Sequence, residues 1–285
     1  MSQEEHEDAI RHLVNNKPQD NYGGLTFNEI SRLTFEMYTP QSPLQIKRKL
    51  SDETLDQMPF FRLTEEFMKI ILRDGSIKLT PLGALPKKVL VELYSHRLIL
   101  EELVEDGLYK LSREIDSASL TTVHLNTTLS RLVRKANGKL LLTKEGKKLL
   151  TPDARNALFL KVLFTFTELT PWGTTDGYPS LPVGNLGWGF TIFMLLREGA
   201  IPHEARYYAD KYLHAFPNLV NAYPPDPFRS NEDLLISCYS LRTFERFLEW
   251  WGFATTDAHG FRLDRHLKIF TAAEILKEVF EFEEL

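Results

Sequence analysis

The sequence predicts a mainly α-helical protein with small β-hairpins, built as two or three winged-helix-like units around an irregular helical middle region. Two observations predict this class. Amphipathic helices are bounded by capping residues and by glycines. The helices are followed by short apolar strands with turn signals, and helix, helix and small hairpin is the order of a winged helix, a helix-turn-helix variant.

The first predicted helix begins at Phe27. Thr26 and Glu29 have the spacing of a capping box, in which each side chain bonds a backbone N–H at the helix start. Two prolines in "YTPQSPLQ" force extended backbone and end the helix. Residues 1–24 are polar and are expected to form a mobile acidic lead-in with room for one short helix.

A pattern of apolar-x-Leu-Thr-x-x-Gly occurs twice, in "IKLTPLGALP" and in "LLLTKEGKKL". For the first copy we expect a helix over residues 64–72, a stop at Gly75, a strand over 76–79 and a type I turn over 80–83. Proline in the following segment then opens a long helix over residues 86–104, with a wide apolar stripe.

The second copy suggests the same order of elements. Its pattern predicts a helix over residues 125–136, a stop at Asn137-Gly138, a strand over 139–142 and a turn over 143–146. The repetition therefore predicts that one supersecondary unit is used twice.

A looser third version follows near the C-terminus. The helix "LRTFERFLEWW" is expected to stop at Gly252, and "FATT", "DAHG" and "FRLD" to form a hairpin. Thr271 and Glu274 have capping-box spacing and predict the start of the final helix.

These elements divide the chain into four predicted parts. After the lead-in, tandem winged-helix-like units occupy residues 25–151 and an irregular, aromatic-rich helical region occupies 152–229. A C-terminal winged-helix-like unit occupies 230–285.

Several segments carry a resemblance to a known family: "GGLTFNEISRL", "LSDETLDQMPFF", "IKLTPLGALPKKVLVELY", "KLLLTKEGKKLL" and "PWGTTDGYPSLP". Their order resembles an uncharacterised bacterial family, some members of which carry a plasmid-encoded open-reading-frame domain. The resemblance implies one structural body from Gly23 to about Phe216. It implies no activity and no site.

The bulk composition is that of a soluble globular protein, and the cysteine count fits a reducing compartment. The chain has 285 residues, of which 43% are hydrophobic and 26% charged. One cysteine, Cys238, permits no internal disulfide, and we expect it to be a buried structural residue in a cytoplasmic protein. The longest uncharged apolar stretch is broken by prolines and glycines, so no membrane partner is expected.

Charge is unevenly distributed along this acidic chain, whose net charge is -5. Residues 127–161 hold nine Lys and Arg against two acidic residues. Lys and Arg bind nucleic-acid phosphate by releasing counterions. The candidate nucleic-acid-binding residues are Arg131, Arg134, Lys135, Lys139, Lys144, Lys147 and Lys148. The alternative is a solvated charged face, or a surface that pairs with acidic segments.

The helix before this cluster offers polar side chains to base edges, namely Asn126, Thr127, Thr128 and Ser130. A separate aromatic loop over residues 172–190 is a candidate ligand site. Its candidate residues are Trp172, Asp176 and Tyr178. The alternative is a loop whose aromatic side chains pack into the core.

The function that these observations favour is a non-enzymatic nucleic-acid-binding or regulatory protein that uses the basic second wing. The alternative is a protein-interaction module, and a third possibility is an enzyme or small-molecule binder at the loop. We expect no cofactor, no metal and no catalytic residue. The sequence lacks a dinucleotide or P-loop glycine motif, a serine-nucleophile elbow and zinc-ligand spacing, including at His203 and His214.

Overall fold

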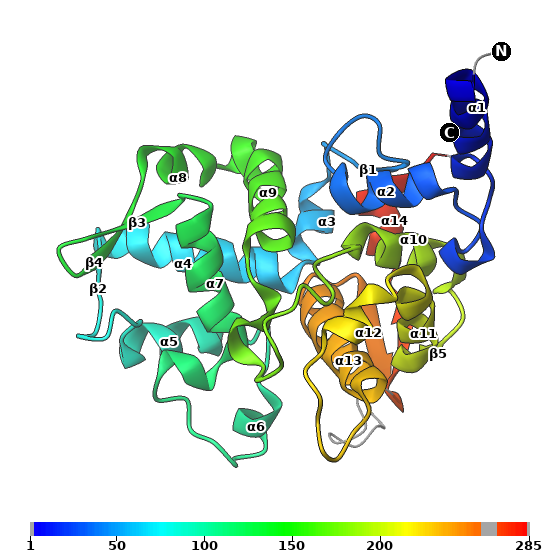
Figure 1. The fold of residues 1–285 in the computed structure, drawn as a ribbon. Coiled ribbons are helices and arrows are strands. Elements are labelled where there is room, and N and C mark those ends of the chain that lie inside the picture. The colour runs from blue at the N-terminus through cyan, green and yellow to red at the C-terminus, as the bar shows by residue number, and fades with distance from the viewer. Residues whose placement is uncertain (1–2, 258–266, 284–285) are drawn as a thin grey trace. The chain divides into compact units, whose positions relative to one another are not determined.

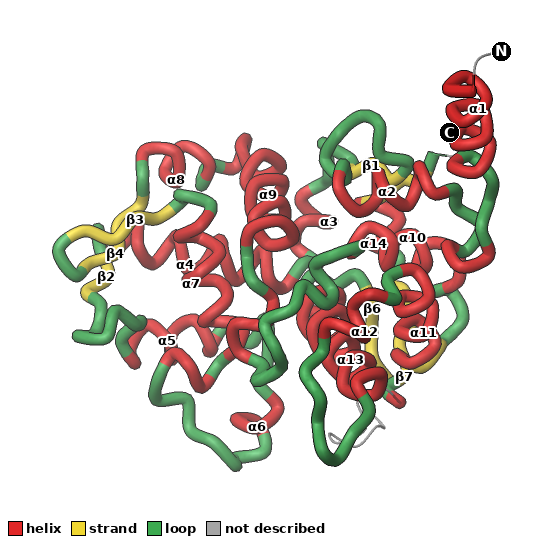
Figure 2. The backbone as a smooth tube through the Cα atoms, viewed as in Figure 1, coloured by secondary structure: helices red, strands yellow, loops and turns green. Residues whose placement is uncertain are grey.

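The structure is a computed structural model that describes residues 3–257 and 267–283. The protein is mainly helical with small antiparallel sheets (Figures 1 and 2). It divides into two compact units. Unit 1 comprises Met1–Lys47, Tyr178–Glu249 and Ala254–Leu285, and unit 2 comprises Arg48–Gly177 and Trp250–Phe253.

The helices and strands of unit 2 are α3 (Asp52–Asp56), α4 (Pro59–Asp74), β2 (Ile77–Lys78), α5 (Lys87–Ser95), α6 (Glu102–Glu105), η2 (Glu114–Asp116), α7 (Ala118–Leu129), β3 (Val133–Ala136), β4 (Lys139–Leu142), α8 (Lys144–Leu149), η3 (Pro152–Ala154), α9 (Arg155–Phe164), η4 (Thr165–Leu169) and η5 (Trp172–Thr175). The three strands form one antiparallel sheet in the order β2-β4-β3.

Aromatic side chains fill the core of unit 2. Phe60, on the buried face of α4, packs edge-on against Phe166 with ring centroids 4.9 Å apart and lies 5.4 Å from Trp251. Edge-to-face pairs of this kind contribute beyond their buried area. Trp251 reaches this core because the chain returns to unit 2 at residues 250–253.

The elements of unit 1 are α1 (Gln3–Asn15), η1 (Asp20–Tyr22), α2 (Phe27–Phe35), β1 (Leu44–Ile46), α10 (Trp188–Glu198), β5 (His203–Glu204), α11 (Ala205–Ala215), α12 (Asn218–Ala222), α13 (Asn231–Tyr239), η6 (Ser240–Leu248), β6 (Ala254–Asp257), β7 (Ile269–Ala272), α14 (Ile275–Val279) and β8 (Phe280–Phe282). Strands β5, β7 and β6 form one sheet in that order, and β1 pairs with β8.

The two units share one order of elements. Unit 2 runs α4, β2, α5, α7, β3, β4, and unit 1 runs α10, β5, α11, α13 with η6, β6, β7. In each sheet the last strand lies between the other two. The chain therefore does repeat a helix–strand–helix–helix–strand–strand order, although the repeat differs from the predicted one.

The predicted short repeat is wrong because strand β3 separates helix α7 from Gly138 in the second copy, whereas α4 runs directly to Gly75 in the first. The strands of the two copies also belong to one sheet. Ile77 pairs with Leu140 and Lys78 with Lys139, so the two copies of the pattern are neighbouring strands of unit 2. The predicted helix over 125–136 is also wrong. Helix α7 ends at Leu129, and Val133–Ala136 forms strand β3.

The Thr-x-x-Gly pattern has a different role in each copy. Gly83 has φ 82° and closes a turn in which its N–H donates to the Thr80 carbonyl, as predicted. Thr143 instead caps α8, because its hydroxyl accepts from the N–H of Gly146. A Cβ on Gly146 would lie 2.2 Å from the Leu132 carbonyl oxygen, so glycine allows close packing of α8 there.

Other predicted boundaries have mixed outcomes. The Thr26–Glu29 capping box is confirmed. The helix over 86–104 is wrong: α5 ends at Ser95, the backbone turns at Arg97 with φ 52°, and α6 is separate. Pro86 precedes α5 as its extended N-cap residue.

The C-terminal hairpin also differs from the prediction. Strand β6 pairs with Ile269–Ala272, while "FRLD" and most of "DAHG" lie outside the described residues. Thr271 belongs to strand β7, so it caps no helix, and the final helix has Glu274 as its N-cap residue. The stop at Gly252 agrees with its positive φ of 70°.

Candidate functional site

The candidate site is built on the β3–β4 hairpin of unit 2. Asn137 and Gly138 connect the strands with φ angles of 49° and 69°. Two positive φ angles are required by the two-residue type I′ turn, and Asn-Gly is its preferred sequence. The Gly138 carbonyl also accepts from the N–H of Leu79, which holds β2 beside the turn.

All seven predicted basic side chains are exposed: Arg131 lies between α7 and β3, three others lie on the hairpin and three on α8. Figure 1 shows β2, β3, β4 and α8 together at one end of unit 2. One further exposed cation, Lys78 on β2, joins them. We call these eight residues the basic surface: Lys78, Arg131, Arg134, Lys135, Lys139, Lys144, Lys147 and Lys148.

Strand register brings cations from three strands to one face of the sheet. Lys78 lies directly opposite Lys139, and Lys139 lies opposite Ala136. Residues directly opposite in an antiparallel sheet point to the same face, and so does every second residue along a strand. Arg134 therefore shares the face of Lys78 and Lys139, while Ile77 points to the opposite, buried face.

The basic surface is not neutralised by neighbouring carboxylates. Glu145, an acidic residue on α8, is bound 2.9 Å from the ammonium of Lys161, which lies on α9. Among residues 3–257 and 267–283, none of the eight side chains forms an ion pair. Like charges directly opposite on a sheet, such as Lys78 and Lys139, destabilise it. A bound anion would remove this repulsion.

The turn before α5 lies beside the basic surface. The Lys135 ammonium lies so close to Gly83 that a Cβ there would be 2.8 Å from it. Leu82, at the tip of that turn, is 96% exposed.

The polar side chains predicted to reach base edges are mostly buried, which corrects that expectation. Asn126 is fully buried and donates to the Val162 carbonyl and the Thr170 hydroxyl, 3.3 Å away in each case. Thr127 and Ser130 are buried and bond to backbone carbonyls. Thr128 is exposed, but α7 carries no Lys or Arg.

The predicted aromatic loop places one of its three candidate residues, Trp172, in the core of unit 2. Trp172 is buried in unit 2, where its indole N–H donates to the Phe166 carbonyl at 2.9 Å. Asp176 belongs to unit 2 and Tyr178 to unit 1. Trp172 therefore has the packing role that was the alternative expectation.

The remaining candidate side chains also have structural contacts. Cys238 is fully buried, as predicted. His203 stacks on Tyr207 with centroids 4.0 Å apart, and the His214 ring lies 2.6 Å from the Asp210 carbonyl oxygen.

Within the described residues, no helix combines the length and the apolar character needed to cross a membrane.

Sequence reasoning missed Lys78, although a signal for it existed. Asn137-Gly138 indicates a hairpin. The second strand of that hairpin begins at Lys139 and has a free edge, along which a third strand can pair. The pairing of that third strand depends on contacts far apart in the sequence.

Comparison with known proteins adds a family likeness for unit 2. The family described as the Y4jL N-terminal domain matches residues 56–156, which contain the basic surface. That description states no activity. No curated protein and no solved structure matches the chain. Residues 56–156 are thus similar to the Y4jL N-terminal domain.

Proposed function

We propose that unit 2 is a winged-helix-like module that binds the phosphate backbone of nucleic acid through the basic surface. The observation that carries the proposal is the placement of Lys78 opposite Lys139, beside Arg134, with no ion pair on any of the eight cations within the described residues. The opposed cations repel one another in the folded state, whereas a bound polyanion would offset this repulsion.

The order of elements in unit 2 supports this assignment. A winged helix places its second and third helices next to a β-hairpin, or wing, whose tip approaches the nucleic acid. By this comparison, β3 and β4 form the wing and α7 is the third helix. Unit 1 has the same order of elements and is a second candidate winged helix.

The composition of α7 favours binding without sequence preference. Base edges are read by side chains on a helix in the major groove, most often Arg, Lys, Asn and Gln. Helix α7 has no Lys or Arg, and its single Asn, Asn126, is buried. Contacts to phosphate position a protein but carry no sequence information. We therefore infer that the wing and α8 supply affinity and that base readout contributes little.

A protein partner is a second candidate, favoured by a different surface of unit 2. Large apolar side chains are exposed between α5 and α7, where α6 is a short helix in a long connection. They are Leu100, Leu103, Leu108, Tyr109 and Ile115, and they are 41–66% exposed. Exposed apolar groups gathered on one segment are typical of protein-interaction sites.

Nucleic-acid binding requires a compartment that contains nucleic acid, and the single cysteine, Cys238, is free and fits a reducing one. The proposal therefore implies a cytoplasmic protein.

The test is fluorescence anisotropy with a labelled 20-base-pair duplex in low salt. We compare the wild type with Lys78→Ala/Lys139→Ala, which removes two opposite cations of the basic surface. The matched control is Lys17→Ala/Lys110→Ala, which removes two exposed lysines elsewhere. Two lost phosphate contacts should weaken binding by roughly ten- to hundredfold at about 0.1 M salt. The control should bind as the wild type does.

Two outcomes would oppose this function. Absence of duplex binding at low salt would leave the protein-interaction surface as the better candidate. Equal weakening by both double variants would show that net charge, and not the basic surface, determines binding.

A further inference from the structure

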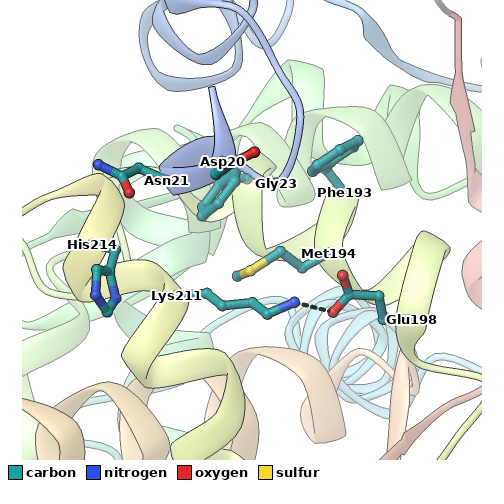
Figure 3. A pocket seen from close by; sticks show the side chains of 9 residues that line it. Asp20, Asn21, Gly23, Phe193, Met194, Glu198, Lys211 and His214 are labelled. Carbon is teal, nitrogen blue, oxygen red and sulfur yellow. Dashed lines mark hydrogen bonds and ion pairs between the residues drawn. The ribbon is translucent and has the colours of Figure 1, made fainter. Parts of the chain in front are cut away.

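Unit 1 contains a pocket that the proposed function does not use. It lies between α10 and α11, is closed from above by η1, and has a volume of about 270 Å³ (Figure 3). Phe190, Phe193 and Met194, from α10, supply an apolar lining. The volume is near the lower end of the range of small-molecule sites and accommodates roughly nine water-sized groups.

The segment that closes the pocket is held to α10 by a hydrogen bond. The N–H of Gly23 donates to the Asp20 carbonyl, and the guanidinium of Arg197 donates to the Gly23 carbonyl. Arg197 also lies over the ring of Phe193, 5.4 Å from its centroid. The Arg197 guanidinium is therefore engaged by the Gly23 carbonyl and by the ring of Phe193.

The lysine of the pocket is already paired. Lys211 lies 2.5 Å from the Oε2 atom of Glu198, and the Tyr207 hydroxyl donates to the same oxygen at 2.9 Å. Figure 3 shows the Lys211 side chain extending along the pocket to reach Glu198. Burial alone would raise the pKa of Glu198, but the hydrogen bonds from Lys211 and Tyr207 outweigh it and lower that pKa. Glu198 is thus a carboxylate at neutral pH.

Two carboxylates of the pocket leave acceptor atoms for a ligand, beside the amide of Asn21, which both donates and accepts. Neither Glu198 Oε1 nor the Asp20 carboxylate has a hydrogen-bond donor among the residues that the structure describes. His214 lies at the pocket with its Nδ1 atom 2.6 Å from the Asp210 carbonyl oxygen. A carbonyl only accepts, so Nδ1 donates.

We propose that this pocket binds a small organic cation, a primary ammonium group on an aromatic or aliphatic body of about nine non-hydrogen atoms. The apolar body lies against Phe190, Phe193 and Met194. The ammonium donates to the free acceptors, with Asp20 supplying the negative charge. An aromatic lining also favours a cation through its ring faces. An anion of the same size would meet the Asp20 carboxylate and would be repelled.

Two probes of nearly identical shape test the charge requirement. We measure binding of phenethylammonium and of 2-phenylethanol to the full chain by titration calorimetry and ligand-observed NMR. We expect phenethylammonium to saturate one site with a dissociation constant of about 1 mM or tighter. The neutral alcohol should bind at least about tenfold more weakly, because it lacks the charge that Asp20 recognises.

Two variants test the location. Asp20→Asn removes the exposed carboxylate of the pocket and should weaken phenethylammonium binding about tenfold. Asp153→Asn makes the same chemical change at an exposed residue of unit 2 and should leave binding unchanged. The inference is overturned by no saturable binding at about 10 mM, by equal binding of the two probes, or by equal effects of the two variants.

Discussion

Replacing Arg155 with alanine should destabilise unit 2 strongly. Its guanidinium forms a two-point hydrogen bond with Glu65, with N···O distances of 2.9 and 3.0 Å. The same group bonds Asp52 at 2.7 Å and Asp56 at 2.8 Å. These contacts join α9 to α3 and α4.

The expected loss follows from the exposure of each carboxylate. The side chains of Asp52 and Asp56 are 68% and 50% exposed, so each of these ion pairs contributes at most about 1 kcal/mol. The Glu65 side chain is only 6% exposed, and removing the partner of a buried charge costs about 3–5 kcal/mol. Arg62 remains 3.8 Å from Glu65 and offsets part of this cost. We therefore expect a loss of about 3 kcal/mol.

The assay is urea unfolding followed by tryptophan fluorescence. Three of the four tryptophans, Trp172, Trp250 and Trp251, belong to unit 2, so the signal reports mainly on that unit. Arg134→Ala is the matched control, since Arg134 is exposed and has no ion pair within the described residues.

A second variant separates lost packing from an unpaired charge. In Arg155→Met/Glu65→Met no buried charge remains, so this variant should be more stable than Arg155→Ala. A loss below about 1 kcal/mol in Arg155→Ala, or a double variant no more stable than the single one, would refute the reasoning.

Two further predictions concern pH and the wing. Burial, and then the charge of Glu245, raise the pKa of Glu249 to about 7 from an ordinary 4.5. The folded state therefore holds this proton longer than the unfolded state, and stability falls as pH rises from about 4.5 to 7. Glu249→Gln should be more stable than the wild type by up to about 3 kcal/mol at pH 8 and nearly equal to it at pH 4, as measured by urea unfolding; equal stability at both pH values would contradict this. Gly138→Val places a β-branched residue at φ 69° and should cost at least about 1 kcal/mol, measured as a shift in thermal unfolding, whereas unchanged unfolding would show that the turn is not type I′.

Local signals in the sequence predicted local structure correctly. The Thr26–Glu29 capping box, the turn at Gly83 and the stop at Gly75 each depend on atoms only a few residues apart. Such contacts are fixed by neighbouring residue types, so the sequence alone suffices for them.

Strand pairing was beyond this kind of reasoning. Residues 133–136 were expected to continue a helix, but they form β3 because Asn137-Gly138 reverses the chain and β4 provides a partner. The Asn-Gly signal was present and was interpreted as a helix stop. Strand β5 has only two residues, so its place at the edge of the second sheet depends on the distant strand β7.

The same limit applies to the candidate site. Seven cations of the basic surface were found from local charge, but Lys78 joins them only through its pairing with Lys139. The burial of Asn126 could not be predicted either, because its partners Val162 and Thr170 belong to later segments.

The salt dependence of duplex binding tests the central claim most directly. If about four cations of the basic surface each neutralise one phosphate, the logarithm of affinity should fall against the logarithm of salt concentration with a slope near −3.6. Arg134→Ala/Lys139→Ala should flatten this slope by roughly 1.8 and weaken binding to different duplex sequences alike. A slope that this variant leaves unchanged, or no binding at low salt, would contradict the account.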